Sequence, residues 1–203
     1  LTGLGPCFIK LGQALSTRPD LVRRDWLEEL TRLQDDLPAF PHATALACIR
    51  EELGAPAEEL FEEFPDTPIA AASLGQVYKA RLQGQHWVAV KVQRPNLTFI
   101  LRRDLVLIRA LGVMTAPLLP LNLGFGLGGI IDEFGRSLFE EIDYGLEAAN
   151  AERFSALFAD NDAVYIPKVE RMLSSTRVLT TTWIDGAKMR DSEELRSQRL
   201  DPT

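Results

Sequence analysis

The sequence contains few of the residues that build metal sites and disulfide frameworks. Its 203 residues include two cysteines and two histidines. Cys7 and Cys48 lie far apart and lack metal-ligand spacing, so we expect two buried thiols in a reducing compartment. His42 and His86 are the only histidines, which excludes a histidine-rich metal site. We therefore predict no metal ligands in this chain.

The sequence also has no excess of positive charge. Lys and Arg number 22 against 29 Asp and Glu, which gives a net charge of −7 at pH 7. Surfaces that bind nucleic acid are usually basic, so we expect no nucleic-acid partner. Neither a signal peptide nor an initiating methionine is visible, and no obvious element ends the chain at Thr203. We expect an intracellular protein of which this chain is a fragment.

One long stretch, from residue 110 to residue 131, has no charge at all. About 20 apolar residues are enough to span a bilayer as a helix. Pro117, Pro120, Asn122 and five glycines interrupt this stretch, however. We therefore favour a packed or mobile linker over a transmembrane helix or a segment that touches a membrane surface.

A hairpin pattern organises the centre of the chain. Two runs rich in β-branched and aromatic residues, 75–82 and 87–92, flank a polar turn that contains Gly84. A shorter run at residues 69–72 predicts one more strand before them. Lys91 lies inside an apolar run, where burying an unpaired charge would be costly. We therefore expect Lys91 to have an anionic partner.

The same hairpin matches the start of a protein-kinase small lobe: a phosphate-covering loop, a Gly-x-Val-Tyr strand, then Val-Ala-x-Lys. In this alignment Ala70 and Ala72 stand where the pattern Gly-x-Gly-x-x-Gly-x-Val has its first two glycines. Alanine adopts positive φ poorly and allows a less close approach of backbone amides to a phosphate. The loop is thus kinase-like in position and altered in chemistry.

The periodicity of the whole chain predicts an α+β fold. Helices are expected over residues 4–17, 23–34, 41–53 and 97–111, in a short segment from 56, over 130–159 and from about 191, with two further strands over 164–169 and 176–184. The helix over 130–159 should kink at Gly135 or Gly145, and it places Glu147 on an otherwise apolar face, as the partner that Lys91 needs.

This order of elements is that of a protein-kinase-like small lobe, with about five antiparallel strands plus a long helix, which ends at the hinge before a large lobe. We expect a helical N-terminal extension over residues 1–66. The small lobe should cover residues 67–184. The hinge and the start of a truncated large lobe should cover residues 185–203.

Two other motifs are weak indications of function. Residues 124–129 satisfy Gly-x-Gly-x-x-Gly, but the prolines before them make a poor strand for a dinucleotide-binding turn. Residues 132–135 read Asp-Glu-Phe-Gly, one residue longer than a metal-binding Asp-Phe-Gly, and lie in a helical pattern. We expect neither motif to bind a ligand.

Four separated segments resemble the UbiB family of atypical protein-kinase-like proteins, also called aarF-domain-containing kinases. They are Lys-Leu-Gly-Gln at residues 10–13, the alanine-rich loop at 70–78, the lysine strand at 88–95, and Glu-Ile-Asp-Tyr at 141–144 followed by Glu147 and residues 150–154. Each motif is modest alone, but the four in this order are specific. The resemblance covers essentially the whole chain.

The resemblance implies an ATP or ADP site. Lys91 would contact the α- and β-phosphates and pair with Glu147. Lys10 and Gln13 would pack across this site near Glu141 and Asp143, where a protein substrate would otherwise bind. The cofactor-binding residues implied in this way are Ala70, Ala71, Ala72, Ser73, Gly75, Val77, Ala89 and Lys91. The implied chemistry is ATP hydrolysis or phosphorylation of a small molecule or lipid, in ubiquinone or other prenyl-quinone metabolism at membranes.

The sequence departs from the family in what it does not contain. Phosphoryl transfer needs a catalytic-loop Asp, a metal-binding Asn and an Asp-Phe-Gly aspartate to hold Mg²⁺ against the phosphates. The family carries these after the hinge, so Mg²⁺ is expected only with the large lobe. Thr182 also stands where relatives usually have an acidic residue. We predict that this chain alone binds nucleotide weakly and does not turn it over.

Each candidate residue also has a plain structural interpretation. Lys91 and Glu147 would then form a structural ion pair, Lys10 and Gln13 would be solvated helix residues, and Glu141 and Asp143 would lie on an exposed acidic face. Three classes of function stay open: the small lobe of an atypical kinase or ATPase in a prenyl-lipid pathway, a nucleotide-responsive scaffold without chemistry, and a helical membrane or protein-interaction module.

Overall fold

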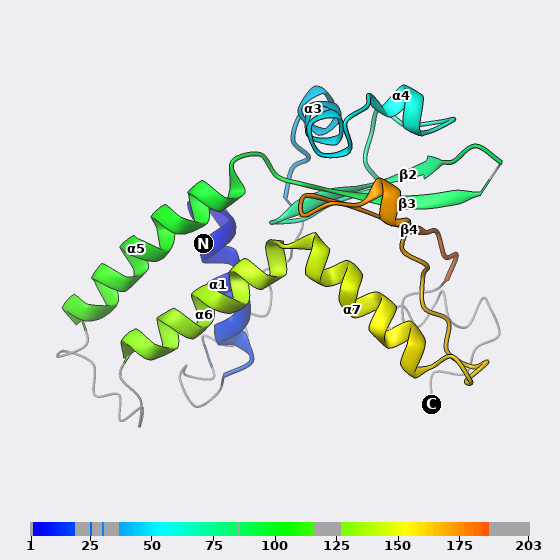
Figure 1. Ribbon diagram of the computed structural model, residues 1–203. Helices are drawn as coiled ribbons and strands as arrows, with labels where there is room; N and C mark the ends of the chain where they lie inside the picture. Colours follow the sequence, from blue (N-terminus) through cyan, green and yellow to red (C-terminus); the bar gives the residue numbers. More distant parts are fainter. Residues whose placement is uncertain are drawn as a thin grey trace.

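The computed structural model describes residues 2–18, 25, 30, 37–84, 86–115 and 127–186. A four-stranded sheet lies at the centre; α3 and α4 lie on one side of it and α7 on the other, while α1, α5 and α6 form a separate helical group (Figure 1). The helices are α1 (Pro6–Ser16), α3 (His42–Leu53), α4 (Ala57–Leu60), α5 (Leu97–Thr115), α6 (Leu127–Ile142) and α7 (Tyr144–Leu157). Two short 3-10 turns, η1 (Thr2–Leu4) and η3 (Arg171–Leu173), complete the helical elements of this part of the chain.

The sheet is antiparallel, and its strands follow one another in sequence order. They are β1 (Ala70–Ala71), β2 (Gly75–Arg81), β3 (Trp87–Gln93) and β4 (Val178–Thr182). The predicted hairpin is confirmed, since β2 and β3 pair with Val77 opposite Lys91. Gly84 closes the turn at φ 95°, in the left-handed region that favours glycine.

The two faces of the sheet differ because side chains alternate along a strand. One face packs under α3 and α4 in an apolar core made of Phe40, Ala45, Ile49, Ala57, Phe61, Tyr78, Ala80, Val88, Val90, Val92 and Val178. The opposite face, here called the lysine face, carries the intervening positions. They include Val77 and Lys79 on β2, Ala89 and Lys91 on β3, and Thr181 on β4, all half-buried, together with Leu179 on β4, which is buried opposite Lys91.

The sheet of the described residues has four strands, where the sequence predicts about five. The run over 164–169 forms only an isolated bridge, between Val169 and Thr181. Pro167 has no N–H, but backbone groups alternate in direction along a strand, so with Lys168 and Glu170 facing β4 the Pro167 nitrogen faces away from it and costs no bond to β4. The chain is nevertheless held beside β4, because the Glu170 N–H donates to the Thr180 carbonyl at 2.9 Å and the Thr182 N–H to the Lys168 carbonyl at 2.9 Å.

The predicted long helix over 130–159 is two helices, and the predicted kink at Gly135 or Gly145 is wrong. The break lies at Asp143, which separates α6 from α7 and has non-helical backbone angles of φ −87° and ψ 95°. Its carboxylate Oδ1 accepts from the Gly145 N–H at 2.9 Å and from the Leu146 N–H at 3.4 Å. This is an N-cap, and it lets the chain turn at the point where the apolar pattern alone predicts a continuous helix.

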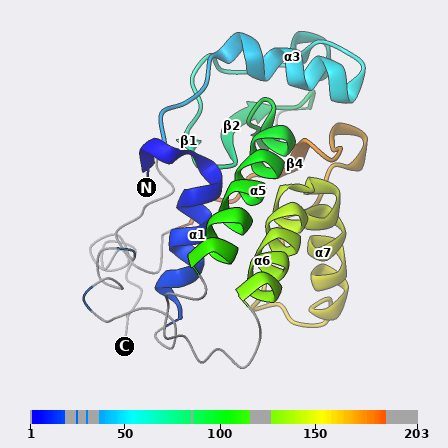
Figure 2. The same cartoon turned by 90° about the vertical axis from the view of Figure 1, so that its left-hand side faces the viewer.

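The separate helical group has its own apolar core. Its buried members are Cys7, Leu74, Leu97, Leu101, Ile108, Ile131, Leu138 and Ile142. Figure 2 shows α1, α5 and α6 running side by side, with α7 next to α6. Both cysteines are free thiols, and burial, followed by the charge of Asp104, raises the pKa of the Cys7 thiol to about 12. Leu74 is the member that comes from the alanine-rich loop, which ties that loop to the helices.

Other predictions of secondary structure are confirmed or lie outside the described residues. Gly54 ends α3 with φ 77°, as expected for a helix-terminal glycine, and α5 extends four residues beyond the predicted end at residue 111 to Thr115. The helix predicted over 23–34 and the one near 191 fall almost wholly on residues that the structure does not describe. Within the described ranges, no helix is both long enough and apolar enough to cross a membrane.

Candidate functional site

Lys91 and Glu147 form the predicted ion pair. Lys91 lies on β3 and Glu147 in the first turn of α7, and Lys91 Nζ donates to Glu147 Oε2 at 2.7 Å. The two side chains are 34% and 45% exposed, so the ammonium group can be reached from solvent. An ion pair this exposed contributes only about 0–1 kcal/mol to stability. Fold stability alone therefore gives little reason for a lysine at this strand position.

Tyr144 lies beneath this pair and explains Gly75. Its ring centroid is 4.4 Å from Lys91 Nζ, a cation–π contact, and its side chain is fully buried. A Cβ on Gly75 would lie 2.5 Å from Tyr144 Oη and 2.6 Å from the Val92 carbonyl oxygen. Burial, with the charge of Glu147, raises the pKa of the Tyr144 phenol. Glycine at 75 is thus required by close packing between the loop, β3 and α7.

The alanine-rich loop is a tight and anchored turn. The Ala72 N–H donates to the Gly75 carbonyl at 2.8 Å, and Arg94 Nε donates to the Ala72 carbonyl at 2.9 Å. Ser73 and Leu74 at the tip are both buried, and Leu74 packs into the core of the helical group. Among the described residues of this loop none has a positive φ. Alanine at positions 70 and 72 therefore causes no backbone strain, contrary to the conformational difficulty expected when glycine is replaced.

A cavity of about 160 Å³ lies between this loop, the lysine face and α1. Its lining residues are Lys10, Ala70, Ala72, Ser73, Leu74, Gly75, Val77, Lys91 and Glu141. Lys10 Nζ, from α1, lies 2.8 Å from Glu141 Oε1, near the end of α6, and the Lys10 side chain is only 15% exposed. The N-terminal helix therefore lies at the wall of the cavity, which Lys10 and Lys91 both line.

The remaining predicted residues are not among the described residues that line this cavity. Glu147 orients Lys91, and Ala89 lies two positions before Lys91 on the same face of β3. The backbone carbonyl of Ala71 accepts from the Leu37 N–H at 3.3 Å. Gln13 is half-buried on α1, and its backbone carbonyl accepts from Ser16 Oγ at 2.6 Å. Asp143 is the N-cap of α7 described above, a structural task that the sequence reasoning did not assign to it.

The cap gives a prediction for Asp143. Asp143→Ala should lower the free energy of unfolding by about 1 kcal/mol, because two amides at the start of α7 lose their acceptor. Asp143→Ser keeps a capping oxygen without the charge and should recover most of this loss. Urea denaturation of the two variants measures the difference. Equal destabilisation by alanine and serine would show that Asp143 acts through its charge and not as a cap.

Two residues that organise the site, Tyr144 and Arg94, were not predicted from the sequence. Tyr144 directly follows the Glu-Ile-Asp segment, and only its contact with Gly75 shows why a large ring is placed there. Arg94 donates from NH2 to the Pro38 carbonyl at 2.8 Å as well as to the loop, and its guanidinium lies over the Phe40 ring. A charged residue just after the lysine strand was the available signal, but it does not identify partners more than 20 positions away.

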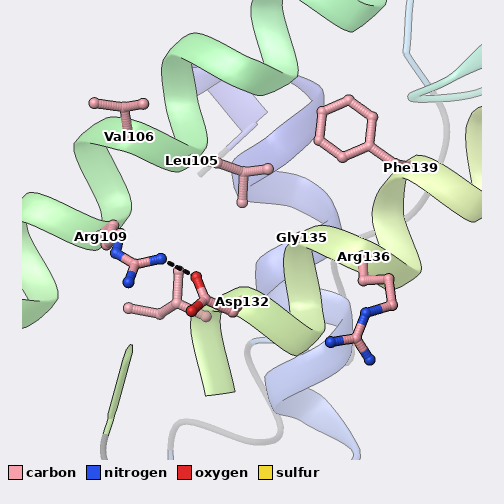
Figure 3. Close-up of a pocket in the computed structure, with 8 residues that line it drawn as sticks. Leu105, Val106, Arg109, Asp132, Gly135, Arg136 and Phe139 are labelled. Atoms are coloured by element: carbon pink, nitrogen blue, oxygen red, sulfur yellow. Dashed lines mark hydrogen bonds and ion pairs between the residues drawn. The ribbon is translucent and has the colours of Figure 1, made fainter. Parts of the chain in front are cut away.

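A larger cavity, about 340 Å³, lies between α5 and α6, away from the two lysines. Leu105 points toward Gly135 in its floor, and Arg109 and Asp132 form an ion pair across the two helices (Figure 3). Arg136 pairs with Glu133 on its own helix at 2.6 Å. As expected, the Asp-Glu-Phe-Gly sequence at 132–135 is part of helix α6. Across the described ranges, no group of three or more His, Cys, Asp or Glu side chains is placed to hold a metal ion.

Comparisons with known proteins support a kinase-like fold for this chain. The model of the ABC1 atypical kinase-like domain matches residues 32–203. An uncharacterized protein of Synechocystis is 52% identical over 203 residues, which is 100% of this chain and 36% of that protein. Protein ACTIVITY OF BC1 COMPLEX KINASE 1, chloroplastic, from Arabidopsis thaliana is 46% identical over 202 residues, 99% of this chain and 30% of that protein.

A solved structure also matches, that of Rv3197 from Mycobacterium tuberculosis in complex with erythromycin. It is 34% identical with a TM-score of 0.63, and the match covers 89% of this chain and 45% of that one. The chain spans about a third of the length of the curated relatives named above. The chain belongs to the ABC1 atypical kinase-like family, the UbiB family, and has the fold of its small lobe with an N-terminal helical extension.

Proposed function

We propose that this chain is the nucleotide-binding portion of an atypical kinase or ATPase of the UbiB type, with ATP or ADP as its ligand. The observation that carries the proposal is the convergence of Lys10 and Lys91 on one cavity beneath the alanine-rich loop. Ammonium groups are the natural partners of phosphate oxygens, and charge-assisted hydrogen bonds are among the strongest available. Glu147 holds the Lys91 ammonium in place, and because this pair is exposed the ammonium can still be reached by a ligand.

The size of the cavity fits part of a nucleotide. Small-molecule sites usually measure about 300–1,000 Å³, and this cavity measures about 160 Å³. We assign it to the phosphates. The base would then lie farther along the lysine face, under Val77 and Ala89, whose small apolar side chains leave room for a flat ring. When bound with the nucleotide, Mg²⁺ would neutralise the phosphate charge, and by resemblance its ligands belong to the large lobe.

The same geometry disfavours transfer of a phosphoryl group from the bound nucleotide to a protein substrate. The Lys10–Glu141 pair brings α1 to the cavity wall, so the N-terminal helix takes up space beside the phosphates. For the full-length protein we propose hydrolysis of ATP, or phosphorylation of a small molecule or lipid, in ubiquinone or other prenyl-quinone metabolism at a membrane face. A nucleotide-responsive scaffold would use the same binding site without chemistry.

Calorimetric titration of the 203-residue chain tests the proposal. ADP and ATP should bind saturably but weakly, because only one side of the site is present. A phosphate-release assay with Mg²⁺-ATP should give no turnover, since by resemblance the residues that hold the metal belong to the large lobe. Absence of saturable binding at millimolar nucleotide would refute the nucleotide site. Mg²⁺-dependent phosphate release by the purified chain would instead refute the prediction of inactivity.

A further inference from the structure

Lys79 lies between two tryptophans on the lysine face. Its Nζ is 4.5 Å from the ring centroid of Trp183 and 5.2 Å from that of Trp87. Trp87 begins β3, while Trp183 directly follows β4, so the lysine joins two segments far apart in sequence. Its side chain is 32% exposed, and a cation held between two indole faces is stabilised by both rings.

The same lysine reaches the segment at residues 183–186, here called the hinge segment. Lys79 Nζ lies 3.8 Å from Asp185 Oδ1, and Trp183 Nε1 donates to that same oxygen at 2.6 Å. The Trp183 N–H donates to the Trp87 carbonyl at 2.9 Å. The Asp185 side chain is 87% exposed, so its ion pair contributes little alone. The segment is therefore held by three kinds of contact: the backbone bond to Trp87, the indole bond to Asp185 and the contacts of Lys79.

The strand register places this arrangement at a defined point of the nucleotide site. Lys79 pairs across the sheet with Ala89, and Ala89 pairs with Thr181. Val77 and Lys91 form the neighbouring row, next to the cavity. The lysine face thus has a phosphate end at Lys91 and a second end at Lys79, with the hinge segment beside it. A base under Val77 and Ala89 would lie between these ends.

We propose that Lys79 is a positioning residue that holds the hinge segment at the base end of the nucleotide site through Trp87 and Trp183. This inference rests on the proposed nucleotide function. Lys79 contacts the hinge segment and lies one row of strand pairs away from Lys91, so in the proposed site it belongs to the base end and not to the phosphate end. Its removal should therefore weaken binding of a complete nucleotide and leave binding of a bare phosphate chain unchanged.

The experiment compares ADP with inorganic tripolyphosphate, by calorimetry, on variants of the 203-residue chain. Lys79→Met keeps the apolar stem and removes the charge, and Lys79→Arg keeps a cation between the indoles. Lys168→Met is the matched control, because its ammonium is 76% exposed and pairs with Glu170 at 3.2 Å, and the bond from the Thr182 N–H to its backbone carbonyl does not depend on the side chain. Hydrogen–deuterium exchange of the amides at residues 183–186, without nucleotide, reports the order of the hinge segment directly.

We expect Lys79→Met to weaken ADP binding roughly three- to tenfold, to leave tripolyphosphate binding unchanged and to speed exchange at residues 183–186. Lys79→Arg should restore both properties, and Lys168→Met should change neither. Unchanged exchange in Lys79→Met, or equal weakening of ADP and tripolyphosphate, would overturn the proposal. If the unaltered chain binds neither ligand, the nucleotide function itself fails, and the exchange experiment still shows separately whether Lys79 orders the hinge segment.

Discussion

Replacing Lys91 with methionine is expected to weaken ADP binding roughly 10- to 100-fold. A charge-assisted hydrogen bond contributes about 1.5–3 kcal/mol, and 1.4 kcal/mol corresponds to a factor of ten in affinity. Methionine keeps the apolar contact with the Tyr144 ring but provides no donor for a phosphate. The fold should survive, because the Lys91–Glu147 pair is half exposed and contributes at most about 1 kcal/mol. Calorimetric titration, with a melting curve of each variant, measures both effects.

Two further variants separate a specific role of Lys91 from a general loss of positive charge. Lys168→Met removes an exposed ammonium elsewhere and should leave ADP affinity unchanged. Glu147→Gln leaves the lysine in place but weakens the contact that orients it, so a smaller loss than in Lys91→Met is expected. If Lys91→Met binds ADP as well as the unaltered chain does, the pair is structural and the site must lie elsewhere.

Gly75→Ala is expected to lower the free energy of unfolding by about 3 kcal/mol. A Cβ at this position would be 2.5 Å from Tyr144 Oη and 2.6 Å from the Val92 carbonyl oxygen. Real Cβ atoms are not found so close to other heavy atoms, and overpacking a buried site costs about 1–3 kcal/mol. Neither neighbour can move easily, because Tyr144 is fully buried and the Val92 carbonyl belongs to a strand. Urea denaturation measures the loss.

A double-mutant cycle with Tyr144→Phe tests the cause. Among the described residues the buried Tyr144 hydroxyl has no hydrogen-bond partner, so removing it should change stability little. The cost of Gly75→Ala should be smaller in the Tyr144→Phe background, although the contact with the Val92 carbonyl remains. Additive effects of the two substitutions would show that the hydroxyl is not the obstacle.

Gly129→Ala supplies the matched control for the glycine substitution. Nothing lies within 4 Å of a Cβ at this position, which is in the first turn of α6. Alanine is favoured over glycine in a helix by about 0.5–1 kcal/mol. The same chemical change should therefore stabilise the protein at 129 and destabilise it at 75.

The lysine pair could be predicted from the sequence because its signals are local. Lys91 interrupts an apolar strand run, and an unpaired charge there would be costly, so a partner was needed. Glu147 stood on an apolar face of a predicted helix. The hairpin followed in the same way from two strand-like runs around a turn with Gly84, and the structure confirms it.

Only the tertiary structure decided how these elements meet. The helical spacing of apolar residues continues through Asp143, so periodicity predicts one helix, and the capping bonds from the Gly145 and Leu146 amides to Asp143 break it. The strand predicted over 164–169 is reduced to a single bridge at Val169, which the residue pattern of this run does not show.

The sequence by itself determined the family, the hairpin and the need of Lys91 for an anionic partner, since each follows from neighbouring residues or from motifs of fixed spacing. The tertiary structure decided why residue 75 is glycine, why Leu74 anchors the alanine-rich loop and why Lys79 lies between two tryptophans. Each of these depends on contacts between residues far apart in sequence. Helical and strand periodicity describes which side of an element is apolar, but it contains no information about which distant residue lies against it.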